Sequence, residues 1–292
     1  MPSVKAISRA AIPRAVLQIV ILVSLWLAYT GARLSAGTDL EAAYVHGDWM
    51  LDADRVMGFD WLDDANRWTT DNGLVALPLC YCYATLHYVA TVLVLVWMWR
   101  RHPIGYPRAV AWLTVMSAVG LVFYQFLPTA PPRFLDGEGF VDTMSAWADW
   151  GWWSESTGPA TGSNRITNEV AAFPSLHVGW AIWCAGVAYR YARRLWVRLL
   201  GWGYPTLITV TVVLTGNHYL IDALAGAALA LLAWLAVEYV ANSWRWAQSG
   251  RRPRQLVVDR ESPPSTRSLV AERPPANEAE DAMATGDLIG DR

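Results

Sequence analysis

Apolar runs and short charged connectors alternate along most of the chain. Six runs are long enough, or nearly so, to cross a bilayer, which takes about 20 residues of helix. They cover residues 12–30, 74–99, 109–127, 176–191, 199–215 and 219–239. Backbone polar groups inside lipid must be satisfied within their own segment, so each run is expected to be an α-helix. The pattern predicts an all-α polytopic membrane protein, with a bundle of six transmembrane helices in a domain of residues 11–243.

Lys and Arg gather in the connectors that would share one side of such a bundle. They occur in the first 14 residues and after the second, fourth and sixth runs, whereas the connectors of the other side are rich in Asp and Glu. Positive charge marks the cytoplasmic side. The protein is therefore predicted to lie in the cell membrane, with both termini, including residues 1–10, in the cytoplasm. The first run also resembles a signal peptide, but an uncleaved anchor is preferred because the topology closes with it retained.

Two segments outside the runs have their own patterns. Residues 48–68 place Trp and other apolar residues among acidic ones, which is typical of interfacial helices that lie on a bilayer with Trp at the headgroups. Residues 244–292 are rich in Pro, Arg, Glu, Ser and Ala. They cannot bury a core, so they are predicted to form a disordered cytoplasmic tail.

Composition agrees with the membrane interpretation. The chain is 54% hydrophobic and 16% charged, whereas soluble domains carry about 25% charged residues. The net charge of −2 averages two opposed surfaces. A nucleic-acid partner is not expected, because the basic residues lie next to membrane ends, where anionic lipid attracts them. The three cysteines fall inside predicted spans and have no disulfide or zinc spacing.

The strongest candidates for chemistry are two histidines at the starts of apolar runs. His177 and His218 are 41 residues apart, enough for one crossing out and one crossing back, so both are expected at the same membrane face. Asp222 follows His218 by four residues, which puts both side chains on one face of a helix. Its carboxylate can fix the imidazole tautomer and leave the other nitrogen free to attack. A simple polar pair is the alternative, but ionisable groups in membrane helices usually mark a function.

Other residues could bind an anion near these histidines. Ser175 is placed to cap the helix that carries His177, and free N–H groups at such an end attract phosphate. Arg133 ends a proline-rich segment on the acid-rich side, where a fixed guanidinium could hold two phosphate oxygens. Weaker candidates for the same oxygens are Arg165, Asn168 and Asn217. Tyr83 and His87 lie one turn apart and could line a substrate cleft, together with Asn168, or simply be packing residues.

Three ordered motifs carry a resemblance. They are P-P-R at residues 131–133, F-P-S-L-H-x-G-W at 173–180 and N-H-Y-x-x-D-x-x-A-G at 217–226. In order and spacing they resemble the type 2 phosphatidic acid phosphatase superfamily, in particular the branch of inositol phosphorylceramide synthases and their bacterial relatives. The resemblance covers roughly residues 40 to 240.

The resemblance implies roles for the candidate residues. His218 would attack phosphorus and form a phosphohistidine, Asp222 would orient it, and His177 would protonate the leaving oxygen and then deprotonate the acceptor. Arg133 would bind the phosphoryl oxygens, and the family needs neither a metal nor another cofactor.

The chain also departs from the broader family. A lysine of the first motif is replaced by Phe126 and an arginine of the third by Val212, losses that the synthase-like branch shares. Arg165 and helix-end N–H groups are the expected substitutes for these missing cations.

These observations predict a membrane enzyme that cleaves a lipid phosphate ester through a phosphohistidine and passes the phosphoryl group to water or another hydroxyl. Its site would be extracytoplasmic. Transfer of a phospholipid headgroup is the alternative within the same chemistry, and the oligomeric state is left open. From other classes, a lipid transporter or flippase would need polar residues near the bilayer midplane. A hydrolase using Ser175 with His218 would need a nucleophile-supporting turn rather than a helix cap.

Overall fold

The second to sixth predicted apolar runs form helices in the structure. The computed structural model describes residues 40–153 and 170–249, and in these ranges every regular element is helical. The long helices are α2 (Leu40–Val56), α3 (Leu62–Asp71), α4 (Gly73–Tyr81), α5 (His87–Arg101), α6 (Tyr106–Phe126), α9 (Leu176–Tyr191), α10 (Leu195–Leu214) and α11 (Leu220–Ser249). A π-helical turn, Cys82–Leu86, joins α4 to α5, and the short elements are α7 (Thr143–Ala146) and the 3-10 turns Pro132–Phe134 and Ala148–Trp150.

Within the described residues, four stretches are long and apolar enough to cross a membrane. They are Gly73–Arg101, Tyr106–Phe126, Leu195–Leu214 and Leu220–Trp246, and they correspond to the second, third, fifth and sixth predicted spans. Large apolar side chains such as Leu93, Leu200 and Leu232 are more than 60% exposed on them, as expected for surfaces that face lipid. The first predicted span, residues 12–30, lies outside the described residues, so the count of six stays a prediction.

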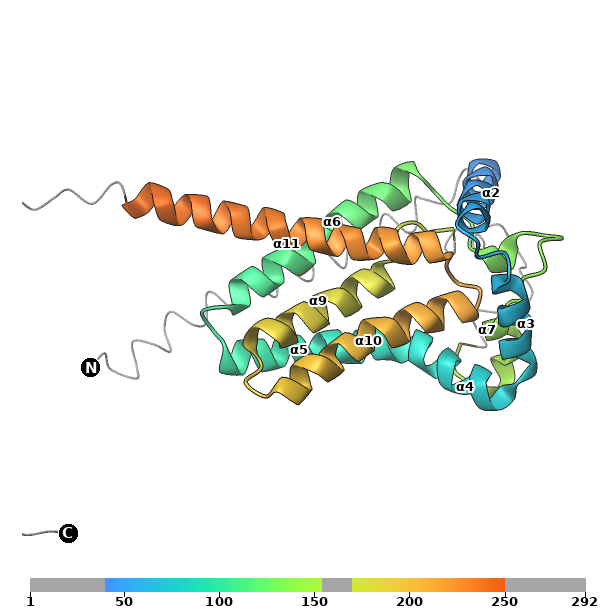
Figure 1. Ribbon diagram of the computed structural model, residues 1–292, viewed down its shortest axis with the longest axis horizontal. Coiled ribbons are helices and arrows are strands. Elements are labelled where there is room, and N and C mark those ends of the chain that lie inside the picture. Colours follow the sequence, from blue (N-terminus) through green and yellow to red (C-terminus); the bar gives the residue numbers. More distant parts are fainter. Residues whose placement is uncertain (1–39, 154–169, 250–292) are drawn as a thin grey trace, which may run out of the picture. The chain divides into compact units, whose positions relative to one another are not determined.

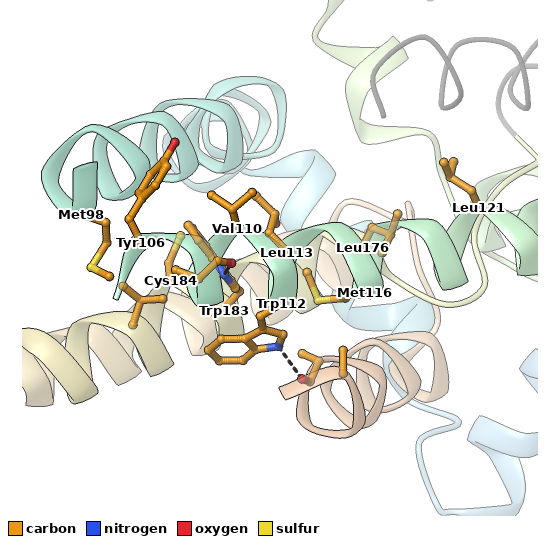
Figure 2. Packing of buried hydrophobic residues seen from close by; sticks show 14 of the residues in the cluster. Met98, Tyr106, Val110, Trp112, Leu113, Met116, Leu121, Leu176, Trp183 and Cys184 are labelled. Atoms are coloured by element: carbon orange, nitrogen blue, oxygen red, sulfur yellow. Dashed lines mark hydrogen bonds between the residues drawn. The ribbon is translucent and has the colours of Figure 1, made fainter. Parts of the chain in front are cut away.

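Helix α9, the fourth predicted span, is the centre of the bundle. It contacts α5, α6, α10 and α11. Its 16 residues extend about 24 Å at 1.5 Å per residue, which is less than the roughly 30 Å of a bilayer core. Two buried indoles tie the bundle together: Trp183 of α9 donates to the carbonyl of Ala109 at 2.8 Å, and Trp112 of α6 donates to that of Ala230 at 2.7 Å (Figure 2).

Two glycines bring the backbones of α9 and α11 together. A Cβ at Gly226 would lie 2.1 Å from the carbonyl oxygen of Ser175. A Cβ at Gly179 would lie 3.1 Å from the sulfur of Met116 and 3.3 Å from the carbonyl oxygen of Gly226. Both glycines belong to the sequence motifs, and the absence of a side chain lets the starts of these two helices approach closely.

The helices α2, α3 and α7 gather at the end of the bundle where α9 and α11 begin (Figure 1). The segment predicted to form interfacial helices, residues 48–68, covers the second half of α2, the connection after it and most of α3. Trp49, Trp61 and Trp68 are more than half exposed there, but the position of these helices on a membrane stays a prediction. At the other boundary, α11 continues to Ser249, and residues 250–292 of the predicted tail lie outside the described residues.

Candidate active site

The two candidate histidines meet at the shared end of α9 and α11. His177 lies in the first turn of α9, and His218 lies in the connection that leads into α11. The Nε2 atom of His218 is 3.3 Å from Nδ1 of His177. The ring centroids are 5.4 Å apart, and the ring planes are inclined at 67° to each other. The structure thus brings together the two imidazoles that the spacing of the apolar runs placed at one face.

Asp222 lies on the other side of the His218 ring. Its Oδ2 is 3.4 Å from Nδ1 of His218 and accepts a hydrogen bond from the backbone N–H of Tyr219 at 3.1 Å. Both side chains are buried, with 4% of His218 and none of Asp222 exposed. A buried carboxylate beside one ring nitrogen favours a proton on that nitrogen. In that tautomer, Nε2, which faces His177, would carry the lone pair.

The turn that carries His218 has a fixed backbone. The N–H groups of Asn217 and His218 both donate to the carbonyl of Val212 at 3.0 Å. Gly216 has a φ of 69°, a left-handed conformation that favours glycine. A Cβ there would also lie 3.1 Å from the carbonyl oxygen of Val141. This turn therefore ends α10 abruptly and aims His218 toward the start of α9.

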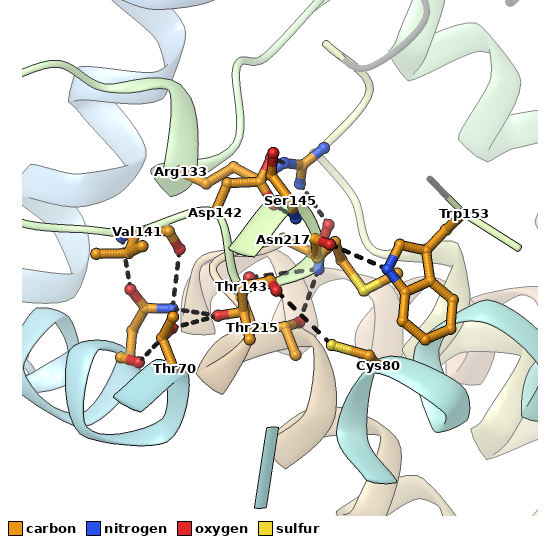
Figure 3. A network of polar contacts seen from close by, with 12 residues as sticks. Thr70, Cys80, Arg133, Val141, Asp142, Thr143, Ser145, Trp153, Thr215 and Asn217 are labelled. Carbon is orange, nitrogen blue, oxygen red and sulfur yellow. Dashed lines mark hydrogen bonds and ion pairs between the residues drawn. The ribbon is translucent and has the colours of Figure 1, made fainter. Parts of the chain in front are cut away.

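Arg133 is held beside the same turn. Its backbone N–H donates to the carbonyl of Gly216 at 3.1 Å, its Nη1 donates to Oδ1 of Asn217, and its Nε lies 3.5 Å from Oδ2 of Asp142 (Figure 3). Asn217 in turn donates from Nδ2 to the hydroxyl of Thr215 at 2.7 Å. Only 8% of the Arg133 side chain is exposed. The guanidinium is therefore oriented before any ligand arrives.

Asp142 is a contact that the sequence did not single out. It was one of many acidic residues in the outer connectors, and no local spacing distinguishes it from the others. It also caps α7, where its Oδ1 accepts from the N–H of Ser145 at 3.0 Å. One carboxylate thus links α7 to the guanidinium of Arg133.

Ser175 is the cap of α9, as predicted. Its hydroxyl accepts from the N–H of Val178 at 3.5 Å, the side chain is fully buried, and its own N–H donates to the carbonyl of Asp222 at 3.0 Å. The hydroxyl therefore serves its own helix. The backbone bond to Asp222 ties the start of α9 to that of α11 and so holds His177 near His218.

Tyr83 and His87 both lie against His177. The Tyr83 ring is stacked on it with centroids 4.7 Å apart, and the His87 ring meets it edge-on at 4.4 Å. Tyr83 belongs to the π-helical turn between α4 and α5, and such turns are frequent at functional sites. These two rings form an aromatic wall behind His177, which extends the candidate site to the helix formed by α4 and α5.

Two sequence candidates, Arg165 and Asn168, lie outside the described residues. Within residues 40–153 and 170–249, no group of three or more His, Cys, Asp or Glu side chains is arranged to hold a metal ion. The site geometry therefore consists of two imidazoles, one carboxylate, one guanidinium and the aromatic wall.

Comparisons with known proteins agree with the resemblance noted in the motifs. A family model described as the PAP2 superfamily matches residues 48–236. A phosphoinositol dihydroceramide synthase from Bacteroides thetaiotaomicron is 27% identical over 191 residues, which are 58% of this chain and 62% of that protein. The chain therefore spans less than two thirds of that relative. No solved structure gave a significant match. Since the family match covers more than half of the chain and includes all three motifs, the chain belongs to the PAP2 superfamily.

Proposed function

We propose that the chain is an integral membrane enzyme that cleaves a phosphate ester of a lipid, with His218 as the nucleophile. One observation carries the proposal: His218 has a carboxylate at one ring nitrogen and a second imidazole 3.3 Å from the other. A nucleophile, its orienting group and a proton-transfer group in this order are the recurring parts of covalent catalysis. Membership of the PAP2 superfamily supports the same reaction class.

In the first step, Nε2 of His218 attacks phosphorus. A P–N bond forms and the P–O bond to the lipid breaks, while protonated His177 gives its proton to the leaving oxygen. Asp222 stabilises the positive charge that develops on the His218 ring. In the second step, neutral His177 takes a proton from water or from another hydroxyl, whose oxygen attacks phosphorus. The P–N bond then breaks and both imidazoles return to their starting states.

Arg133 is proposed to bind the oxygens of the transferred group. The phosphoryl group carries dispersed negative charge during transfer, so positioning and cationic support do most of the catalysis. The contacts of Arg133 with Asn217 and Asp142 support a pre-oriented guanidinium. We propose that Asn217 acts through this contact, that Arg165 adds a second cation, and that Tyr83, His87 and Asn168 line the substrate cleft.

The acceptor distinguishes a phosphatase from a headgroup transferase. Both need the same residues around phosphorus, so the site serves either reaction. We favour hydrolysis, and the relative named phosphoinositol dihydroceramide synthase supports transfer to a lipid hydroxyl as the second candidate. A transporter without catalysis is less favoured, because the buried ionisable side chains His87, His218 and Asp222 lie together at one end of the bundle.

The proposed topology has both termini in the cytoplasm and the site at the extracytoplasmic face. The charge distribution of the connectors supports it. Residues 11–243 would form the membrane domain, with the first span as an anchor, and residues 244–292 the cytoplasmic tail. Such a site would act on lipids whose headgroups project from the outer leaflet.

The decisive experiment compares the wild-type enzyme with His218→Ala and His102→Ala. The control, His102, lies at the opposite end of α5. Each purified protein is incubated with membrane phospholipids and polyprenyl phosphates, and free phosphate is separated from transferred headgroup. His218→Ala is expected to insert and fold but to lose turnover and acid-labile phosphoenzyme, whereas His102→Ala retains both. Full turnover by His218→Ala would exclude the assigned nucleophile, and the product ratio of the wild type separates hydrolysis from transfer.

A further inference from the structure

A buried carboxylate from α2 holds the start of α11. Asp54 is 2% exposed, and its two oxygens accept from the backbone N–H groups of Leu220 at 2.7 Å and Ile221 at 2.9 Å. The first N–H groups of a helix have no partner inside that helix, and a negative charge there is favourable. Capping residues normally lie directly before the helix in the same sequence. Here the cap comes from a helix 166 residues earlier in the sequence.

A second buried side chain holds the end of α10. Asn66 of α3 is fully buried, and its Nδ2 donates to the carbonyl of Leu214 at 2.9 Å. Its amide also binds residues near Asp142: Nδ2 donates to the carbonyl of Val141 at 3.2 Å, and Oδ1 accepts from the N–H of Val141 at 2.7 Å. Asn66 therefore fixes Leu214, the last residue of α10, and Val141, the residue directly before the Asp142 that contacts Arg133.

These two contacts lie on either side of the turn that carries His218. Leu214 ends α10, Leu220 begins α11, and the residues between them include Asn217 and His218. The turn is thus held at its two ends by side chains of α2 and α3, elements that contribute no group of their own to the set of histidines, carboxylate and guanidinium described above.

We propose that Asp54 and Asn66 are positioning residues that fix His218 for attack, an inference that rests on the proposed function of His218. Asp222 is the third residue of α11, so a shift of the start of this helix changes its 3.4 Å separation from His218. A displacement of about 1 Å in a catalytic group can cost on the order of 100-fold in rate. Without the two N–H bonds to Asp54, the start of α11 would lose this link to α2 and keep the backbone bond between Ser175 and Asp222.

The test compares the wild type with Asp54→Asn and with Asp60→Asn as the matched control. Asp60 is an exposed acid in the connection between α2 and α3. The measurements are kcat and KM on one phosphate ester, the thermal midpoint, and hydrogen exchange of residues 219–222 in detergent. Asp54→Asn is expected to lower kcat by roughly 10- to 100-fold with KM close to the wild-type value, and to speed exchange at Leu220 and Ile221. Asp60→Asn should match the wild type in all measurements.

A wild-type kcat in folded Asp54→Asn would overturn the proposal. So would a rate that falls only in proportion to the fraction of the variant that is unfolded. If Asp54→Asn does not fold, Asp54→Glu is the second variant, because it keeps the charge but displaces the carboxylate by a longer side chain. A wild-type kcat in Asp54→Glu would then overturn the proposal. Asn66→Ala should show the same kcat effect with faster exchange at the end of α10. If His218→Ala is inactive while Asp54→Asn is fully active, the positioning role fails and the nucleophile stands. If His218→Ala remains active, the proposed function fails, whatever the exchange data show.

Discussion

The close approach of α9 and α11 makes Gly226→Ala an informative substitution. The added Cβ would lie 2.1 Å from the carbonyl oxygen of Ser175, whereas real Cβ contacts essentially never fall below 3.0 Å. The two backbones must therefore separate by about 0.9 Å at this point. The hydrogen bond from the N–H of Ser175 to the carbonyl of Asp222, now 3.0 Å, lies at the same crossing and lengthens with it.

The expected cost combines three effects. Overpacking costs about 1–3 kcal/mol, the weakened hydrogen bond costs about 1 kcal/mol, and alanine regains about 1 kcal/mol of helix propensity over glycine. The free energy of unfolding should fall by roughly 1–3 kcal/mol. His177 is two residues from Ser175, so kcat should also fall, by up to about 100-fold.

The assay is unfolding of the purified protein in detergent, combined with kcat on a phosphate ester. Gly203→Ala in α10 is the control, because nothing lies within 4 Å of the Cβ that it would add. It should raise the free energy of unfolding by up to about 1 kcal/mol and leave kcat unchanged. The close-contact reasoning is refuted if Gly226→Ala stabilises the protein as much as Gly203→Ala does.

Three further predictions concern the site and its support. His177→Ala should lower turnover of lipid esters by about 10²–10⁴-fold but affect p-nitrophenyl phosphate less, because its leaving group needs no protonation; equal losses on both would argue against a general acid. Arg133→Lys keeps the charge but loses the forked geometry, so kcat/KM should fall by roughly 100-fold or more, and wild-type kinetics would exclude direct phosphate binding. Burial raises the pKa of the Asp54 carboxyl above its ordinary value of 3.8; the N–H groups of Leu220 and Ile221 oppose this shift and the charge of Asp222 adds to it. Since the folded state then holds the proton more tightly than the unfolded state, the stability that this tighter proton binding adds is complete below pH 3.8 and is lost as pH rises through the raised pKa. Unfolding of the wild type and of Asp54→Asn across this range should show that loss only in the wild type, and parallel pH curves would contradict it.

The sequence predicted the parts of the site that depend on local pattern. The bounds of the fourth apolar run coincide with those of α9. The 41 residues between His177 and His218, enough for two membrane crossings, placed both histidines at one face. The four-residue step from His218 to Asp222 predicted that the two side chains meet, but the expected shared helix face was wrong for His218, which lies in the connection before α11.

Contacts that depend on how distant helices cross could not be predicted in the same way. Asp54 was one acid among many in an outer connector, and its burial follows only from the packing of α2 against α11. Asn66 has no charge or motif to mark it. The one-turn spacing of Tyr83 and His87 predicted a shared face, but their contact with His177 required the observed packing of α5 against α9.

The enclosure of α9 by four neighbours has a consequence for how the protein meets membranes of different thickness. A helix surrounded by protein need not match the hydrocarbon layer, and α9 falls short of it by about 6 Å. The depth of His177 would then be determined by protein contacts rather than by the lipids. In thicker or thinner bilayers the helices around α9 should change their tilt, while the distance between the imidazoles of His177 and His218 stays the same.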